Sequence, residues 1–100
     1  MTHFEAVYAS ESVRKKCLDF LDGIPKDYRD KIYECITKLQ EHPHPAGKLV
    51  KKLRGYIDIA GRTAQFRARV GPYSILYDID EDRKKVILLS IKRRSEKTYS

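Results

Sequence analysis

Two arginines lie two positions apart in the segment 64–70, where apolar and polar side chains alternate strictly. Alternation is typical of a β-strand, so Arg67 and Arg69 are expected on one face, roughly 7 Å apart. Like charges held this close are unfavourable unless an anion lies between them. Because guanidinium groups bind phosphate bidentately, the spacing predicts a site for a nucleic-acid backbone. The alternative is that each arginine pairs with a nearby carboxylate, such as that of Asp78.

Further basic residues lie near the ends of predicted strands: Lys52 and Arg54 in one, and Lys92, Arg93 and Arg94 after the last. Taken alone, either cluster could be a solvated run that keeps an edge strand from pairing. On strands next to the two arginines, they predict an extended basic surface. Tyr99 lies near the C-terminus without apolar neighbours, so it either packs back on the sheet, is disordered, stacks on a base or moves a proton.

Other reactive residue types form no recognisable site. The three histidines lack further ligands at metal spacing, so neither a metal nor a cofactor is predicted. Cys17 and Cys35 are expected to be buried thiols, because an offset of roughly 7 Å along a helical hairpin is awkward for a disulfide.

The first half of the chain predicts one strand, over 3–9, and two helices. Ser10 can cap the first helix, which ends at Asp22 and Gly23, and Pro25 fits the first turn of the second, which ends before 42–45. Their apolar residues follow helical spacings and give each helix one apolar face: Val13, Cys17, Leu18 and Leu21, then Tyr28, Ile32, Cys35, Ile36 and Leu39.

From Lys48 onward the period of the pattern changes to two. Strands are expected over 49–54, 64–70, 73–80 and 86–91, with an irregular connection over 56–63. Short connections make the later strands antiparallel neighbours. The sequence thus predicts a single α+β domain over 1–100, of order β-α-α-β-β-β-β and mostly antiparallel. Its helical hairpin covers the sheet face that carries Phe66, Val70, Ile75, Tyr77 and Ile79, and the basic face stays open.

Charge is divided unevenly along the chain. Residues 1–47 hold 7 basic and 8 acidic side chains, whereas residues 48–100 hold 14 basic and 6 acidic ones. This asymmetry predicts one face that meets polyanions. No apolar run reaches the roughly 18 residues of a membrane span. The first residues have no signal-peptide pattern, so a cytoplasmic protein without membrane contact is expected.

Several segments together resemble the RelE/ParE toxin superfamily over nearly the whole chain: KLRG at 52–55, FRARVGPY at 66–73, LYDI at 76–79, KRR at 92–94 and Tyr99. The tyrosine after a basic strand end is more similar to the RelE branch. That resemblance implies a ribosome-dependent endoribonuclease toxin that cleaves mRNA in the ribosomal A site and is silenced by a cognate RelB-like antitoxin. The ParE branch implies an inhibitor of DNA gyrase instead.

The resemblance also implies residue roles. Catalytic positions fall on Arg67, Arg69, Arg93 and Tyr99, and substrate-binding positions on Lys52, Arg54, Lys92 and Arg94. The family usually has arginine where this chain has Ser74. This departure either shifts the work of that arginine to Arg94 or Arg62, or leaves a third function, a catalytically weakened module that binds nucleic acid or protein.

Cleavage by such a site starts when a ribose 2′-OH attacks the adjacent phosphate, leaving a 2′,3′-cyclic phosphate and a 5′-OH. Arginines stabilise the charge that gathers on the phosphoryl oxygens. Because arginine keeps its proton, the base is expected to be Tyr99 or a lysine of lowered pKa, such as Lys52 or Lys92.

Overall fold

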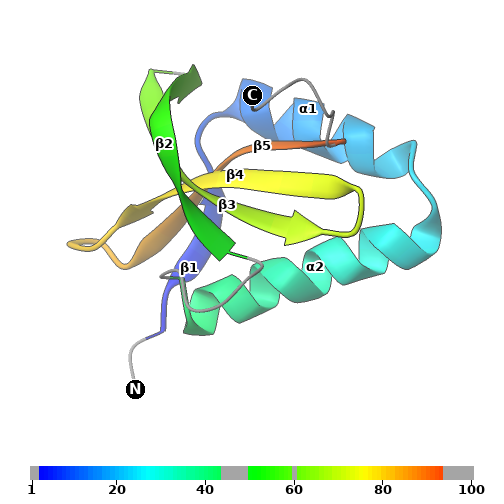
Figure 1. The fold of residues 1–100 in the computed structure, drawn as a ribbon, viewed down its shortest axis with the longest axis horizontal. Helices are drawn as coiled ribbons and strands as arrows, with labels where there is room; N and C mark the ends of the chain where they lie inside the picture. Colours follow the sequence, from blue (N-terminus) through cyan, green and yellow to red (C-terminus); the bar gives the residue numbers. More distant parts are fainter. Residues whose placement is uncertain (1–2, 44–49, 60, 94–100) are drawn as a thin grey trace.

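The computed structural model describes residues 3–43, 50–59 and 61–93, and within it residues 50–58 are described by their backbone. In chain order, its elements are β1 (Glu5–Tyr8), α1 (Glu11–Asp22), α2 (Lys26–Glu41), β2 (Val50–Ile59), β3 (Arg62–Val70), β4 (Tyr73–Asp80) and β5 (Lys85–Arg93). The described strands form one five-stranded sheet, β1-β5-β4-β3-β2 (Figure 1). β1 runs parallel to β5, and the other neighbouring pairs are antiparallel. This confirms the predicted α+β architecture.

The start of α1 and the turn into α2 are fixed by hydrogen bonds close in sequence. The Ser10 hydroxyl accepts from the backbone N–H of Val13 at 3.2 Å, and Glu11 adds a favourable charge to the first turn. At the other end, Nε of Arg29 donates to the carbonyl of Leu21 at 2.9 Å. Arg29 belongs to α2, so this bond holds the start of the second helix against the end of the first.

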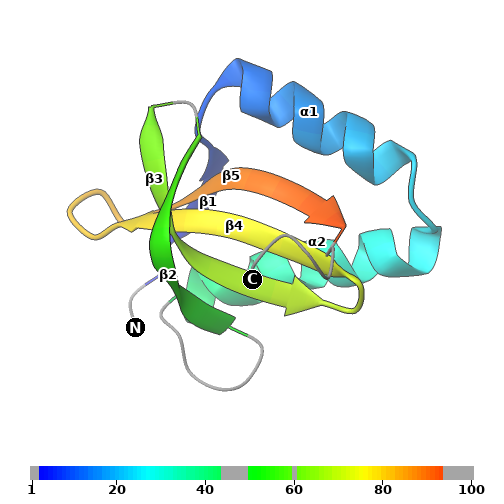
Figure 2. The ribbon, with the colours of Figure 1, turned by 45° about the horizontal axis from the view of Figure 1, so that its top comes forward.

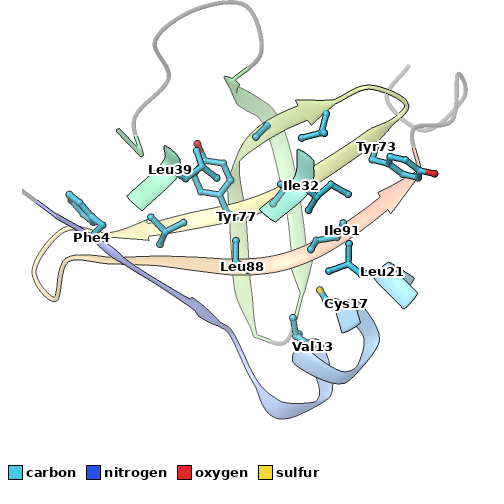
Figure 3. Packing of buried hydrophobic residues seen from close by; sticks show 14 residues of the cluster. Phe4, Val13, Cys17, Leu21, Ile32, Leu39, Tyr73, Tyr77, Leu88 and Ile91 are labelled. Carbon is cyan, nitrogen blue, oxygen red and sulfur yellow. The ribbon is translucent and has the colours of Figure 1, made fainter. Parts of the chain in front are cut away.

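The two helices pack on one face of the sheet, with α2 behind the strands and α1 on the β5 side (Figure 2). The core between them joins buried residues of both layers (Figure 3): Val13, Cys17 and Leu21 of α1, Ile32 and Leu39 of α2, and Ala68, Val70, Tyr73, Ile75 and Tyr77 of the sheet. The sheet face predicted to meet the helices is therefore confirmed.

Tyr77 ties this core to the end of α2. Its side chain is fully buried, and its hydroxyl donates to the carbonyl of Pro43 at 2.8 Å. Burial raises the pKa of the Tyr77 phenol well above its ordinary value. The phenol therefore stays protonated and remains a hydrogen-bond donor.

The segment 56–63, expected as an irregular connection, is mostly strand, so that prediction was wrong. β2 continues to Ile59 and β3 begins at Arg62, which makes a tight hairpin with Gly61 at a φ of +77°. The pairing register shifts between Lys52 and Ile57. Gly55 lies within that irregular stretch, and a glycine there interrupts the regular pairing without ending the strand.

The β2–β3 hairpin curls over the face of the sheet that the helices leave open (Figure 2). A second, smaller apolar cluster lies there, formed by the buried residues Ala64, Leu76, Ile87 and Leu89. Ile59 from the hairpin and Val7 from β1 pack against it. The open face, hereafter the face opposite the helices, is thus apolar toward β1 and the hairpin tip.

The β3–β4 turn gives a stability prediction. Gly71 has a φ of +54°, and a methyl group added there would lie 2.7 Å from Cε1 of Tyr28. The Tyr28 ring packs edge-on against Tyr73 with centroids 5.3 Å apart, which limits how far it can move. Gly71→Ala should therefore lower the free energy of unfolding by about 2–5 kcal/mol, through left-handed strain and overpacking. Urea denaturation measures this loss.

Gly61→Ala is the matched control for that substitution. Gly61 also has a positive φ, +77°, but no atom lies within 4 Å of a methyl group added there. Only the backbone strain remains, so the expected loss is about 1–2 kcal/mol. If both variants lose the same free energy, contact with Tyr28 is not the cause.

Candidate nucleic-acid interface

Cross-strand pairing places three predicted site residues on the open face. Arg69 of β3 pairs with Ser74 of β4, and Ser74 pairs on its other side with Lys92 of β5. Directly paired residues of neighbouring strands point to the same side of a sheet. Arg67, two positions before Arg69, pairs with Leu76, a member of the open-face cluster. Arg67, Arg69 and Lys92 therefore share the face opposite the helices.

Short side chains lie between these long cationic ones. Ser74 and Leu76 have exposed fractions of 0%, whereas the two arginines and the lysine are half-buried. β3 and β5 flank β4, so their backbones are roughly 10 Å apart. We call Arg67, Arg69, Ser74 and Lys92 the basic strip. Its cationic groups on two strands can approach one anionic ligand from both sides.

Arg93 lies on the other side of the sheet. It pairs in register with Tyr73, and its guanidinium carbon is 5.9 Å from the centroid of the Tyr73 ring, a cation–π contact. Tyr73 belongs to the core under the helices and packs edge-on against Phe20 at 5.7 Å. The structure therefore does not bring Arg93 together with Arg67 and Arg69. Lys92 takes the open-face position at this end of β5.

Four other predicted residues have less defined places. Lys52 lies in β2 opposite Phe66, and Arg54 lies in the stretch of β2 where the pairing register shifts. Arg94 and Tyr99 lie outside the described residues. The substrate-binding and catalytic roles of these four stay predictions.

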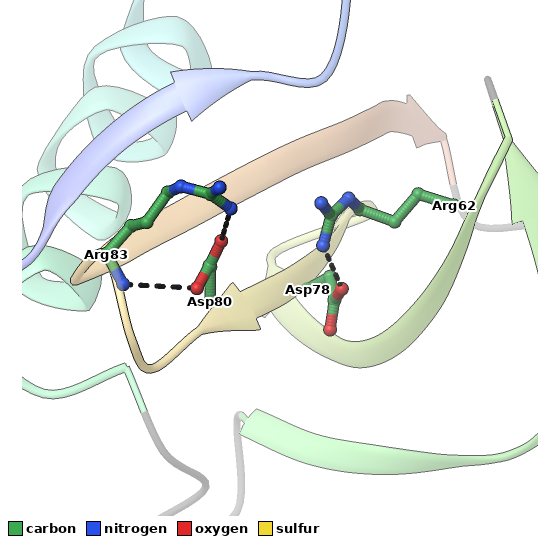
Figure 4. A network of polar contacts seen from close by, with 4 residues as sticks. All are labelled: Arg62, Asp78, Asp80 and Arg83. Atoms are coloured by element: carbon green, nitrogen blue, oxygen red, sulfur yellow. Dashed lines mark hydrogen bonds and ion pairs between the residues drawn. The ribbon is translucent and has the colours of Figure 1, made fainter.

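Asp78, the carboxylate suggested as a partner for Arg67 or Arg69, forms an ion pair with Arg62 (Figure 4). Nη1 of Arg62 lies 2.8 Å from Oδ2 of Asp78, with side chains 40% and 8% exposed, respectively. Two residues on, Asp80 accepts hydrogen bonds from the backbone N–H and the guanidinium of Arg83. These bonds hold the pKa of the Asp80 carboxyl below its usual range. The sequence interpretation missed the Arg62–Asp78 pair because it put Arg62 in an irregular connection.

Two buried side-chain atoms in the described residues have no hydrogen-bond partner, Oγ of Ser74 and Oδ1 of Asp78. Buried polar atoms in folded proteins are nearly always bonded, so each such exception calls for an explanation. Both residues belong to β4.

The thiols offer no reactive nucleophile. Cys17 and Cys35 are free, as predicted, with Cys17 buried and Cys35 half-buried. Burial raises the pKa of both, so they stay protonated. In the described part of the chain, no three His, Cys, Asp or Glu side chains gather as metal ligands. Within the same residues, no helix is long and apolar enough to cross a membrane.

A cavity of about 400 Å³ lies between the start of α1, β5 and the hairpin tip. Its lining combines apolar Val13, Ile59 and Leu89 with the hydroxyls of Ser10, Ser12 and Ser90. The lining includes none of the arginines of the basic strip, so the cavity is separate from that strip.

Known proteins share this fold. A family model described as the ParE toxin of the type II toxin–antitoxin system parDE matches residues 8–98. The chain matches no curated protein sequence. The archaeal RelE–RelB complex from Pyrococcus horikoshii is similar in structure, with a TM-score of 0.71, 27% identity, and coverage of 96% of this chain and 99% of that one.

Two further structures share the fold at lower identity. A RelBE toxin–antitoxin complex from Mycobacterium tuberculosis has a TM-score of 0.64 at 22% identity and covers 92% of this chain and 99% of its own. A free double arginine-to-alanine mutant of the Escherichia coli toxin RelE has a TM-score of 0.61 at 18% identity, with 98% and 88% covered. The family model matches nearly the whole length of the present chain. This chain therefore belongs to the ParE toxin family of type II toxin–antitoxin systems, within the RelE/ParE superfamily.

Proposed function

We propose that this chain is a ribosome-dependent endoribonuclease toxin that cleaves mRNA in the ribosomal A site. The observation that supports this most is the basic strip, in which Arg69 and Lys92 flank the buried Ser74 and Arg67 lies beside them. Cations converging from two strands suit the phosphate of a single-stranded RNA. The similarity to an archaeal RelE–RelB complex supports a RelB-like antitoxin as the partner that neutralises the toxin.

The strip suits charge stabilisation better than proton transfer. The phosphoryl oxygens gain negative charge as the 2′-OH attacks, and Arg67 and Arg69 would stabilise that charge. Neither can accept the 2′-OH proton, because arginine stays protonated. The general base that accepts this proton is therefore expected to be Tyr99, Lys52 or Lys92. A site this poor in acid–base groups gains most from a ribosome that orients the mRNA, which explains the proposed dependence on it.

An in vitro translation reaction with mapped mRNA ends tests this function. Adding the purified chain should produce new 5′ ends within the codon in the A site, and naked mRNA should remain intact. The fragments upstream of the cut should end in a 2′,3′-cyclic phosphate, which resists ligation until it is opened. If translation proceeds with intact mRNA, the proposal is wrong.

The family model itself favours a second function, inhibition of DNA gyrase, because its description names the ParE toxin. A supercoiling reaction with purified gyrase distinguishes the two functions. A gyrase inhibitor should block supercoiling at concentrations that leave mRNA uncut, whereas the endoribonuclease should leave supercoiling unchanged.

Ser74 favours a third function, a binding module with weakened catalysis, because the superfamily usually has arginine there. A chain of this kind should bind RNA or a partner protein. Translation should then proceed with intact mRNA, and gyrase should supercoil DNA normally. Ser74→Arg, which restores the usual residue, should then raise cleavage of ribosome-bound mRNA from background.

A further inference from the structure

The two unpartnered polar atoms lie on the same side of the same strand. Ser74, Leu76 and Asp78 alternate along β4, and Asp78 pairs with Ile87, a residue of the open-face cluster. The α-carbons of Ser74 and Asp78 are about 13 Å apart at the rise of a β-strand. Both atoms are buried and unbonded. The face opposite the helices thus holds two buried polar atoms for which the described residues supply no partner.

The two atoms need different partners. Ser74 lies between Arg69 and Lys92, so an anionic group is favoured there, and the buried hydroxyl can donate to it once the side chains that cover it move aside. Oδ1 of Asp78 can accept from an N–H or O–H group, because Oδ2 already accepts from Arg62. A ligand that satisfies both carries an anion at one end and a hydrogen-bond donor at the other. A nucleotide has this character, with a phosphate and the amino group of its base.

We propose that Asp78 recognises a base of single-stranded RNA whose phosphate lies at Ser74, and that it selects bases carrying an amino group. The inference rests on the proposed function and adds a base preference to it. Carboxylates accept hydrogen bonds from N4 of cytosine, and proteins read unstacked RNA bases along their Watson–Crick edges. Uracil presents the acceptor O4 at the corresponding position, so a carboxylate oxygen disfavours it.

The position of Arg62 explains how a base reaches a buried oxygen. Arg62 comes from the curled hairpin and bonds one oxygen of the carboxylate, but 40% of its side chain is exposed (Figure 4). A base reaches Oδ1 when the exposed part of the Arg62 side chain moves aside while Nη1 keeps its bond to Oδ2. An RNA is favoured over a protein ligand because Arg67, Arg69 and Lys92 match a run of phosphates on the same face.

Fluorescence anisotropy with oligocytidine and oligouridine RNAs of equal length tests the inference. The wild-type chain should bind oligocytidine about five- to tenfold more tightly. In Asp78→Asn, the amide can donate to O4 of uracil, so the two affinities should come within about twofold. Asp80→Asn removes the same charge two residues along β4, where the carboxylate pairs with Arg83, and should keep the wild-type preference.

A modified RNA gives a second test that needs no variant. Oligomers of N4,N4-dimethylcytidine lack the amino N–H groups, so the wild-type chain should bind them no better than oligouridine. The inference is overturned if the wild-type chain binds all three RNAs equally, binds none of them, or keeps its preference in Asp78→Asn. It is also overturned if Asp78→Asn weakens only the binding of an antitoxin.

Binding is measured without ribosomes and detects no cleavage. A chain that prefers cytidine but leaves ribosome-bound mRNA intact would support the base preference and refute the proposed function. A chain that cuts mRNA but binds both RNAs alike would support the proposed function and refute the base preference.

Discussion

Replacing Arg67 and Arg69 together by alanine should reduce cleavage of ribosome-bound mRNA by at least about 10³-fold. Removing one preorganised group that stabilises transition-state charge typically costs about 10²–10³-fold in rate. Two such groups around one phosphate act as a unit, so their losses do not simply multiply. Both side chains are half-buried on the open face, whereas Ala68 and Val70 between and beside them supply the core. The variant should therefore fold, and its cleavage is measured by mapping mRNA ends.

Arg14→Ala combined with Arg83→Ala is the matched control. This control also removes two positive charges, but it takes them from exposed ion pairs with Glu11 and Asp80. Exposed pairs contribute about 0–1 kcal/mol to stability, so this variant should fold and cut mRNA like the wild type. An equal loss in the control would mean that total charge, and not the basic strip, drives the reaction.

Salt dependence separates binding from catalysis in the same variants. Each phosphate contact with a single strand contributes about −0.7 to the slope of log affinity against log salt. Loss of Arg67 and Arg69 should flatten the slope for single-stranded RNA by about one to two units. An unchanged slope would show that the two arginines do not face the nucleic acid.

The sheet and its helical cover follow from patterns that the sequence displays. In β3, apolar Phe66, Ala68 and Val70 alternate with Arg67 and Arg69, and only one arrangement buries the apolar set. The helices repeat apolar residues at helical spacing, and most of these are buried in the core. Such local patterns predicted both layers and the side of the sheet on which the arginines lie.

The side of β5 on which each basic residue lies could not be predicted in the same way. Residues 86–91 are apolar on both faces, so alternation does not indicate to which side the next residues of the strand point. The register between β4 and β5 also shifts between Leu76 and Tyr77. These features place Lys92 on the open face and Arg93 over Tyr73, whereas the resemblance had assigned the catalytic role to Arg93.

The Arg62–Asp78 pair depends on three-dimensional curvature that the sequence does not display. The hairpin has to curl over the open face before Arg62 can reach β4. Gly55 suggested that the strand ended early, which removed Arg62 from the predicted sheet. The register shift in β2 is accompanied by a tertiary contact, the packing of Ile59 against the second cluster, which local sequence preference does not reveal.

Tyr99→Phe should lower mRNA cleavage at the ribosome at least about tenfold while ribosome binding changes little, because general acid–base groups contribute about 10²–10⁴-fold in rate. The phenylalanine ring can still stack on a base, but it has no proton to exchange. Tyr99→Ala removes the ring as well and should be worse. Tyr33→Phe, which removes a hydroxyl from a side chain 43% exposed on α2, is the control and should cut mRNA normally. Rates come from mapped ends, and binding from co-sedimentation with ribosomes.

The outcomes assign the proton transfer to one group or another. If Tyr99→Phe cuts mRNA normally and only Tyr99→Ala is impaired, the ring is a stacking platform, and a lysine becomes the base. Lys92→Arg then tests that role, because arginine keeps the charge of the basic strip but cannot accept a proton. If cleavage survives Lys92→Arg as well, Lys52 on the edge strand is the remaining candidate. If neither Tyr99 variant is impaired while the double arginine variant is inactive, the catalytic role of Tyr99 is refuted, and the reaction depends on charge stabilisation by the strip.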